Sequence, residues 1–238
     1  MLYLKDVQNV RANSMTHSFP KIIWQTHNYT KDQLPEHLNQ IGATWKNLNP
    51  GWEYRYIDHK QRDELVRSYP EIYKTYKQQG PTFQSDIWRF LVTYEHGGCY
   101  ADMDSVCIKP LDYLLQEINP LTQMVTVPVY KGWGNTHNYV TQKHSQPMSR
   151  VFNEMIKNPE TLIKWQAWEI FIKHVYSDET VSQTFVVQTS ENSIADIAAN
   201  HSKDYKDFFN PYSHQVNNYG KIMKYSDFVQ ENNLSFGL

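Results

Sequence analysis

Short apolar strands alternate with amphipathic helices along the first half of the chain, and this alternation constrains the fold more than any other feature. Lys21–Gln25 (KIIWQ), preceded by Pro20, predicts a first strand, and Glu53–Ile57 (EYRYI) predicts a second because charged and apolar residues alternate. Between them, apolar residues recur at helical spacing, at Leu38, Ile41, Trp45 and Leu48. We therefore expect an α/β fold with a largely parallel central sheet.

The segment before the first acidic motif predicts a helix followed by a strand. Ser85–His96 carries one apolar stripe, and Gly97-Gly98 ends the helix because glycine readily adopts positive φ angles. Cys99–Asp102 then predicts a short strand that leads directly into Asp-Met-Asp. Sheets of this class bind ligands at the carboxyl ends of their strands, where Asp102 and Asp104 fall. The other predicted elements are helical stretches up to Tyr76 with a break at Pro70, strands over Gln123–Tyr130 and Thr184–Gln188, and helices over Met148–Lys157, Glu160–Tyr176 and Ser193–Asn200.

Composition bounds the size of the fold and the kind of partner. The 238 residues are 40% hydrophobic and 20% charged, which is enough to build a sizeable core. Repeats, low-complexity tracts and linkers are absent from the sequence, so residues 1–238 are expected to form a single domain. The formal charge of −2, with Lys and Arg scattered, argues against a nucleic-acid-binding surface. A small-molecule or glycan partner is expected instead.

The sequence contains no recognisable signal peptide or membrane-spanning segment. Met1–Met15 lacks the apolar core of a secretory signal peptide, and no run approaches 18 apolar residues. A soluble, cytoplasmic protein without a transmembrane segment is the resulting expectation. The two cysteines, Cys99 and Cys107, are too few for a disulfide scaffold and are expected to be free thiols.

Four charged residues form the pattern that carries the chemistry. Asp86 and Arg89 lie three apart on one face of the predicted helix, and after twelve intervening residues Asp102 and Asp104 come at the end of the predicted strand. A D-x-D alone is a weak signal, but the joint D-x2-R and D-x-D pattern after a glycine pair is much more specific. Paired carboxylates at an irregular strand end can converge on one ion.

This pattern fits the chemistry of a nucleotide-sugar donor. Cleaving the bond between a sugar and a diphosphate leaves negative charge on the phosphates, and a cation stabilises that charge as it develops. Mg²⁺ or Mn²⁺ does this with one or two carboxylates, the phosphates of the donor and water. The carboxylate of Asp86 could hold sugar hydroxyls, and the guanidinium of Arg89 could hold phosphate or sugar oxygens.

At these residues the sequence resembles glycosyltransferase family 32, the group with a sugar-binding region that contains a DXD motif. The group includes capsular-polysaccharide enzymes and fungal initiating mannosyltransferases. The glucosylating domains of large clostridial toxins look like distant relatives. The resemblance begins at FPKIIWQTH (Phe19–His27), continues through NPGWEYRYID (Asn49–Asp58) and is tightest over SDIWRFLVTYEHGGCYADMDS (Ser85–Ser105).

The resemblance implies a GT-A-type, three-layer α/β/α fold and transfer with retention of anomeric configuration. It implies a Mn²⁺ or Mg²⁺ cofactor held by Asp102 and Asp104. The donor would be a UDP-sugar, with a GDP-sugar as second choice, and the acceptor a glycan or glycoconjugate hydroxyl. Residues 1–130 would bind the nucleotide sugar and residues 131–238 would face the acceptor. The remaining implied donor contacts are Asp86 and Arg89 to the sugar, Gln25, Thr26 and His27 to the nucleotide base, and Asn138 to the donor.

The sequence also departs from that family. Relatives often carry a Gly-Pro pair in a late loop, where this chain has Thr189-Ser190-Glu191-Asn192, and a His-and-Trp tail, where it has Phe236-Gly237-Leu238. No residue is identified as a general base, and the leaving phosphate would assist proton transfer on the same face of the sugar. These departures bear on the acceptor and on a lid over the donor.

Other functions remain open from the residues alone. Asp102-Met103-Asp104-Ser105-Val106 also fits the D-x-D-x-[TV] string of haloacid-dehalogenase-like phosphatases, although the sequence lacks the late acidic cluster of that class. A non-catalytic nucleotide-sugar or glycan-binding module is a further alternative. Glycoside hydrolysis fits less well, because its two carboxylates flank a sugar instead of sharing an ion. Trp24 and Trp88 are interpreted as core residues before ligand contacts.

Overall fold

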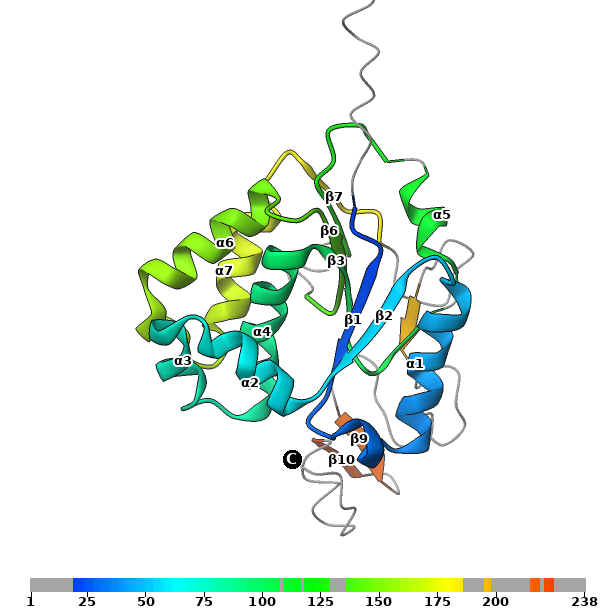
Figure 1. The fold of residues 1–238 in the computed structure, drawn as a ribbon, viewed down its shortest axis with the longest axis horizontal. Coiled ribbons are helices and arrows are strands. Elements are labelled where there is room, and N and C mark those ends of the chain that lie inside the picture. The colour runs from blue at the N-terminus through cyan, green and yellow to red at the C-terminus, as the bar shows by residue number, and fades with distance from the viewer. Residues whose placement is uncertain are drawn as a thin grey trace, which may run out of the picture.

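A six-stranded sheet runs through the centre of the described part of the chain, in the order β2-β1-β3-β6-β5-β7 (Figure 1). The computed structural model describes residues 19–107, 109–116, 118–128, 136–185, 195–197, 215–218 and 221–224. The strands of the sheet are β1 (Ile22–Thr26), β2 (Glu53–Ile57), β3 (Gly98–Ala101), β5 (Met124–Thr126), β6 (Asn138–Thr141) and β7 (Val181–Ser182).

The sheet is mixed, and one strand is reversed. β1 pairs parallel with β2 and β3, and β5 pairs parallel with β7. β6 runs antiparallel to both of its neighbours, β3 and β5. The expected mixed, mostly parallel α/β sheet is therefore confirmed. Because β6 is reversed, its first residue lies at the edge of the sheet where β1, β2 and β3 end.

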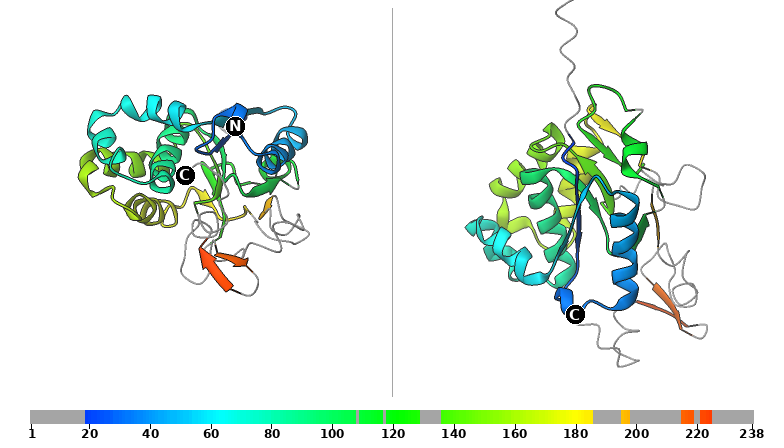
Figure 2. Two further views of the ribbon diagram at one scale, coloured as in Figure 1. Left: turned by 90° about the horizontal axis from the view of Figure 1, so that it is seen from below. Right: turned by 45° about the vertical axis from the view of Figure 1, so that its right-hand side comes forward.

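Helices cover both faces of the sheet, which confirms the three-layer arrangement (Figures 1 and 2). One face carries α1 (Glu36–Leu48) and α5 (Leu111–Leu115). The other face carries α4 (Pro81–His96), α6 (Gln146–Lys157) and α7 (Gln166–Val175). The helices α2 (His59–Arg67) and α3 (Pro70–Tyr76) pack against α4. The short 3-10 helices are η1 (Lys31–Gln33) and η2 (Pro159–Thr161).

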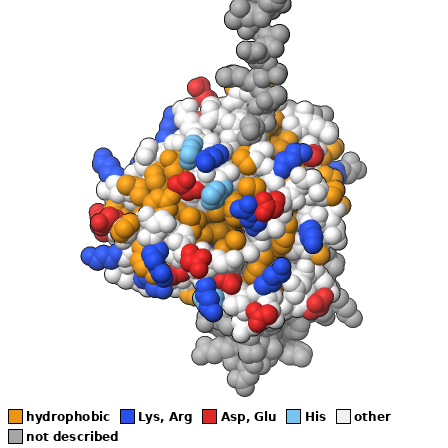
Figure 3. Space-filling model, in the orientation of Figure 1, with side chains coloured by type: hydrophobic (Ala, Val, Ile, Leu, Met, Phe, Trp, Pro, Cys, Tyr) orange, Lys and Arg blue, Asp and Glu red, His pale blue; other side chains and the backbone are white. Residues whose placement is uncertain are grey.

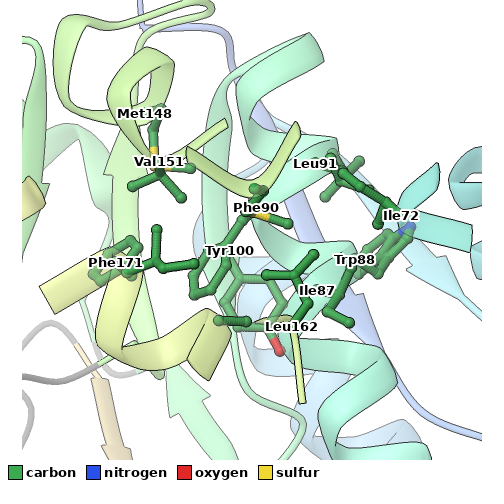
Figure 4. Packing of buried hydrophobic residues seen from close by; sticks show 14 of the residues in the cluster. Ile72, Ile87, Trp88, Phe90, Leu91, Tyr100, Met148, Val151, Leu162 and Phe171 are labelled. Carbon is green, nitrogen blue, oxygen red and sulfur yellow. The ribbon is translucent and has the colours of Figure 1, made fainter. Parts of the chain in front are cut away.

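Strand alternation explains why two apolar cores form. Successive side chains of a strand point to opposite faces, so neighbouring residues enter different cores. Trp24 and Tyr100 belong to the core under α4, α6 and α7, whereas Ile23 and Cys99 belong to the core under α1 and α5. Figure 4 shows the first core, in which side chains of α4, α6 and α7 pack with Tyr100 of β3.

Large aromatic residues fill that first core. The rings of Phe90 and Phe171 stack with centroids 4.8 Å apart, and Trp24 meets Trp88 edge to face at 6.4 Å. Trp24 and Trp88 are 3% and 1% exposed, so both are core residues, as expected. Burying side chains of this size contributes about 1.5–3 kcal/mol each to the free energy of folding.

Gly97 and Gly98 connect α4 to β3 in backbone conformations that disfavour other residues. Their φ angles are 66° and 97°. A Cβ at Gly98 would lie 2.5 Å from the carbonyl oxygen of Ile22 on the adjacent strand. The glycine pair therefore both ends the helix and allows β3 to pair closely with β1, which places the acidic motif at the edge of the sheet.

The first half of the chain follows the predicted elements closely, with ends that shift by a few residues. β2 has the predicted bounds, β1 is displaced by one residue, and the helix predicted from Ser85 begins at Pro81. Of the strand predicted over Gln123–Tyr130, Met124–Thr126 forms β5, and its last two residues lie outside the described residues.

Three predictions in the second half are wrong. The helix predicted over Glu160–Tyr176 divides into η2 and α7, because the backbone turns at Lys164, where φ is 53°. The strand predicted over Thr184–Gln188 is found earlier, as β7, because Val181 and Ser182 pair with β5. Residues 184 and 185 are not in a strand, and residues 186–188 lie outside the described part.

The helix predicted near Ser193–Asn200 is replaced by a strand over the residues that are described. Ala195–Ile197 forms β8, which pairs antiparallel with β4 (Ser105–Cys107) in a separate two-stranded sheet. The patterns also failed to indicate the antiparallel pair β9 (Gln215–Asn218) and β10 (Lys221–Lys224). The late loop at residues 189–192 and the tail at residues 236–238 lie outside the described residues.

The described surface carries charges of both signs. On the face seen in Figure 3, Lys and Arg side chains are interspersed with Asp, Glu and hydrophobic side chains. In the described part of the chain no helix has the length and apolar character needed to cross a bilayer. Cys99 and Cys107 are free and buried, as expected, and burial raises the pKa of the Cys107 thiol to about 11.

Candidate active site

The predicted site residues meet at one edge of the sheet. The register pairs Trp24 of β1 with Tyr100 of β3, so Gln25 and Asp102 come at the carboxyl ends of adjacent strands. On the other side of β3, Ala101 pairs with Asn138, and the Asp102 N–H donates to the carbonyl of His137 at 2.8 Å. The edge is therefore built from the ends of β1 and β3 and the start of β6.

Gln25 holds the backbone of the acidic motif. Its side chain is fully buried, and its amide Nε2 donates to the carbonyl oxygen of Asp102 at 3.0 Å. Its Oε1 accepts from the hydroxyl of Tyr54 at 2.9 Å. Both ends of the amide are thus used inside the protein. In this structure Gln25 positions the turn that carries Asp102, and its expected contact with a nucleotide base stays a prediction.

Arg89 lies buried between two carboxylates. Its Nη2 is 2.7 Å from Asp86 Oδ1 and its Nη1 is 3.2 Å from Asp102 Oδ1. Its guanidinium also lies over the ring of Tyr100, at 4.6 Å from the centroid, and Nη1 donates to the carbonyl of Thr136 at 3.0 Å. Because the Arg89 side chain is only 5% exposed, the pair with Asp86 is a buried ion pair and not a surface salt bridge.

Two further groups fix the carboxylate of Asp102. The hydroxyl of Tyr100 donates to Oδ1 at 2.6 Å, and Nδ1 of His137 lies 2.7 Å from Oδ2. Burial alone would raise the pKa of Asp102, but the charge of Arg89 and these hydrogen bonds outweigh it and hold that pKa well below its usual range. Asp102 is therefore ionised at neutral pH.

His137 responds to the same acidic surroundings. Burial lowers the pKa of its imidazole, whereas the hydrogen bond and charge of Asp102, together with the charge of Asp104, raise it. The net direction of the pKa shift is upward. His137 thus places an imidazole with a raised pKa beside the DXD motif.

The acidic motif retains the capacity to hold one divalent cation. An ionised carboxylate offers about four acceptor positions, of which Tyr100, Arg89 and His137 use three on Asp102. One position on Oδ2 remains, and Asp104 follows in the turn after β3, half-buried. Among the described residues no cluster of three or more His, Cys, Asp or Glu side chains could cage a metal. This donor set fits Mg²⁺ or Mn²⁺, which take one or two carboxylates together with substrate phosphates and water.

Asn138 presents a buried acceptor close to the motif. Its Nδ2 donates to the hydroxyl of Ser105 at 3.0 Å, which ties the start of β6 to the residue after Asp104. Its Oδ1 is buried without a hydrogen-bond partner among the described residues. A buried polar atom of this kind usually has a hydrogen-bond partner. An acceptor without a donor in the described protein fits a residue at the edge of a ligand site.

The last two residues expected at the base lie on β1 and just after it. The hydroxyl of Thr26 donates to the carbonyl of Ile57 at 2.6 Å, so this buried side chain ties β1 to β2. The ring of His27 stacks on that of Tyr29, with centroids 4.7 Å apart. His27 is half-buried and remains at the sheet edge, whereas Thr26 serves the fold in this structure.

A comparison with known protein families matches the segment that holds the acidic motif and Arg89. Residues 35–123, which include Asp86, Arg89, Asp102 and Asp104, match the family described as the glycosyltransferase sugar-binding region containing the DXD motif. This region is therefore similar to the DXD glycosyltransferases. The predicted resemblance is therefore confirmed over the segment that holds the buried Arg89 and its two carboxylates.

Curated relatives align with less than half of the chain. An initiation-specific alpha-1,6-mannosyltransferase of Candida albicans is 32% identical over 101 residues, which are 40% of this chain and 26% of the relative. The inositol phosphoceramide mannosyltransferase 3 of Schizosaccharomyces pombe is 30% identical over 118 residues, which are 48% of this chain and 33% of the relative. The aligned segment thus spans about a quarter to a third of these relatives.

A solved structure extends the likeness beyond the DXD segment. The PaToxG glycosyltransferase superposes with a TM-score of 0.51 over 66% of this chain and 69% of its own, at 14% sequence identity. At that identity the likeness concerns the fold alone. The expected GT-A-type fold is confirmed at this level.

Three further residues of the site, within the DXD segment or close to it, were not predicted from sequence patterns. Tyr100, His137 and Thr136 hold Asp102 and Arg89 but match no motif. A signal for Tyr100 exists, because residues two apart on a strand point to the same face, and Tyr100 precedes Asp102 by two. The contacts of His137 and Thr136 depend on the antiparallel pairing of β6, which the sequence did not indicate.

Proposed function

We propose that the protein transfers a hexose from a nucleotide-sugar donor to a hydroxyl acceptor, assisted by Mn²⁺ or Mg²⁺. The observation that carries the proposal is the buried Arg89 between Asp86 and Asp102, inside the segment that matches the DXD glycosyltransferase family. This arrangement keeps Asp102 ionised and fixed at the carboxyl edge of the sheet, where ligands of such sheets bind.

Each side chain has a role in the proposed reaction. Asp104 and the remaining acceptor position of Asp102 would hold the cation, which when bound would neutralise charge on the departing diphosphate. Arg89 holds Asp102 in one orientation, and Gln25 holds its backbone. Asp86, with one oxygen on Arg89, would accept hydrogen bonds from hydroxyls of the donor sugar. Preorganisation of this kind stabilises charge without reorganisation during the reaction.

The unpaired Oδ1 of Asn138 supports its expected place at the donor, where it would accept a hydrogen bond from a donor hydroxyl. His137, whose Nδ1 lies 2.7 Å from Asp102 Oδ2 and whose pKa is raised, would lie near the diphosphate. Retention, with the leaving phosphate assisting proton transfer, remains part of the proposal on the strength of the family.

The names of the relatives bear on the sugar. Both curated relatives described above are named as mannosyltransferases, which makes mannose the first candidate for the transferred hexose. The nucleotide remains a proposal, with UDP expected first from the sequence and GDP second. The donor panel must therefore contain hexoses on both nucleotides.

The proposal is tested by nucleotide release and thermal shift with a panel of UDP- and GDP-hexoses. The protein is incubated with each donor, with Mn²⁺, with Mg²⁺ or with EDTA. We expect one donor to yield nucleoside diphosphate only when metal is present. At 100 times its Kd, that donor should add about 2.7 kcal/mol to the free energy of unfolding, a melting shift of about 5–10 °C.

Two results from the same panel would overturn the proposal. Stabilisation by a donor without release of nucleoside diphosphate would identify a binding module, the alternative left open by the sequence. Equal turnover with metal and with EDTA would exclude the metal-assisted chemistry.

A further inference from the structure

An exposed tryptophan stands at the start of α7, beside the amino end of α4. The side chain of Trp165 is 59% exposed, and the neighbouring Ile163 is 49% exposed. The ring of Trp165 meets that of Phe83 edge to face, with centroids 5.2 Å apart and planes at 88°. An edge-to-face contact engages only part of the indole, so most of its apolar surface remains open to solvent.

The exposure of Trp165 does not come from loose packing. Leu162 and Ala167, on either side of it, are both 1% exposed and belong to the core under α4, α6 and α7. Lys164 adopts a φ of 53°, a conformation that residues other than glycine adopt rarely, and its N–H donates to Oε1 of Gln79 at 3.0 Å. The chain is thus anchored at both sides of a turn that directs Trp165 outward.

Phe83, which contacts the exposed ring, lies on the same helix as Asp86 and Arg89 of the proposed donor site. Phe83 lies three residues before Asp86 on α4, and side chains at this spacing are neighbours on a helix. Arg89, which pairs with Asp102, lies a further three residues along the same helix. The rise along the axis of α4 from Phe83 to Arg89 is about 9 Å. The contact between the rings of Phe83 and Trp165 adds to this separation. This separation is about that of one to two sugar rings.

We propose that Trp165, supported by Phe83, forms an acceptor subsite that binds a hexose ring of a glycan by stacking. An exposed aromatic ring fits the apolar C–H face of a pyranose. Amide side chains suited to sugar hydroxyls belong to the residues next to this turn: Gln166 follows Trp165, and its Nε2 donates to Glu169 at 2.8 Å, while Gln79 accepts from the N–H of Lys164. The inference rests on the proposed glycosyl transfer, and it places the acceptor in the part of the chain after residue 130, as the sequence suggested.

The test separates acceptor binding from donor chemistry. Trp165→Ala, Trp165→Phe and the control Tyr113→Ala, which removes an exposed ring on α5, are compared with the wild type. The acceptors are methyl α-glycosides of mannose, glucose and galactose and the corresponding disaccharides. Three quantities are measured: the KM for acceptor, the rate of donor hydrolysis without acceptor, and glycan binding without donor by saturation-transfer NMR.

We expect Trp165→Ala to raise the KM for the best acceptor about tenfold, equivalent to about 1.4 kcal/mol, while donor hydrolysis stays at the wild-type rate. Trp165→Phe should recover part of the loss, and Tyr113→Ala should change neither quantity. An unchanged acceptor KM and unchanged NMR signals in Trp165→Ala would overturn the inference.

Two further outcomes are decisive. If the wild type turns over no donor, the proposed transfer fails, and glycan binding that depends on Trp165 would still support the subsite. If Trp165→Ala instead abolishes sedimentation with phosphatidylcholine vesicles and leaves glycan binding intact, the ring belongs to a membrane contact and the inference is wrong.

Discussion

At the scale of single residues, Arg89 is the group on which the site depends most. It is buried, and its guanidinium pairs with the carboxylates of both Asp86 and Asp102. Removing one member of a buried ionic group leaves the others without a partner, which costs more than the attraction it supplied. The same residue therefore serves both the stability of the fold and the charge state of Asp102.

Arg89→Ala should lower the free energy of unfolding by about 3–5 kcal/mol, because it removes the guanidinium from the buried ion pair with Asp86 and from Asp102. Urea unfolding at pH 7 measures the change. The matched control is Arg67→Ala, because Arg67 pairs with Asp63 while its side chain is 65% exposed. Such an exposed pair contributes about 0–1 kcal/mol. Equal losses of stability in the two variants would show that the buried Arg89 contributes no more to the fold than an arginine in an exposed ion pair.

The sequence predicted which residues gather at this edge better than it predicted what they do. Asp86, Arg89 and Asp102 were recognised from their spacing, and they contact one another. Gln25 was expected at a nucleotide base, yet its amide binds Tyr54 and the Asp102 carbonyl. An amide has the same appearance in a sequence whether its partners are ligand or protein, so this role required the register of β1 and β3.

At the scale of elements, α1 contacts the acidic motif through a chain of side chains. Gly42 of α1 leaves room for the hydroxyl of Tyr54, which binds Gln25, which in turn holds the Asp102 carbonyl. A Cβ at Gly42 would lie 2.4 Å from the Tyr54 hydroxyl oxygen. Glycine inside a helix normally weakens it, so its presence here is explained by this close approach.

Gly42→Ala should therefore destabilise the protein by about 1–3 kcal/mol, the opposite of the gain that helix propensity predicts. It should also slow donor turnover, because Tyr54 and Gln25 can no longer hold the turn. Thermal or urea unfolding and nucleotide release measure the two effects. Adding Tyr54→Phe should recover part of the stability, since it removes the clashing oxygen. Gly51→Ala, where no atom lies within 4 Å of the added Cβ, is the control. A stabilised Gly42→Ala would contradict the steric account.

Asp63 joins α2 to α3 and gives a prediction about pH. Burial raises the pKa of Asp63, but hydrogen bonds from Tyr73, Lys77 and Arg67 outweigh burial and lower it. A carboxyl whose pKa is lower in the folded state stabilises the fold above its unfolded pKa, and this contribution is lost as pH falls through the folded pKa. Asp63→Asn should cost about 1–2 kcal/mol at pH 7, with the difference from wild type shrinking below about pH 4. Urea unfolding at both pH values tests this, and a pH-independent difference would contradict it.

Local patterns predicted elements well where local forces decide and poorly where pairing decides. Gly97-Gly98 ends α4 because of its own backbone freedom, and this was predicted correctly. Ala195–Ile197 became a strand because β4 supplies its partner, although its composition suggested a helix. The turn at Lys164 was hidden because Ile163 and Trp165 continue the apolar pattern while lying exposed. A binary pattern cannot distinguish a core residue from an apolar residue that faces a ligand.

At the scale of the whole molecule, the family match and the likeness in fold cover different shares of the chain. The family match spans residues 35–123, whereas the likeness to the PaToxG glycosyltransferase covers 66% of the chain. The donor-side residues lie in or beside the family segment, and the exposed Trp165 lies beyond it. A constant donor site joined to a divergent acceptor side is what we expect of transferases that share a donor chemistry and differ in acceptor.

The central claim, that the DXD motif holds a metal-bound diphosphate, is tested most directly by Asp104→Asn. Nucleotide release from the best donor is measured for the wild type, for Asp104→Asn and for Glu64→Gln, which changes an exposed carboxylate on α2. The substitution removes a charged metal ligand, so we predict that Asp104→Asn lowers the rate by about 100-fold or more, with an unchanged melting temperature, while Glu64→Gln retains the wild-type rate. A wild-type rate in Asp104→Asn, with metal still required, would contradict the account.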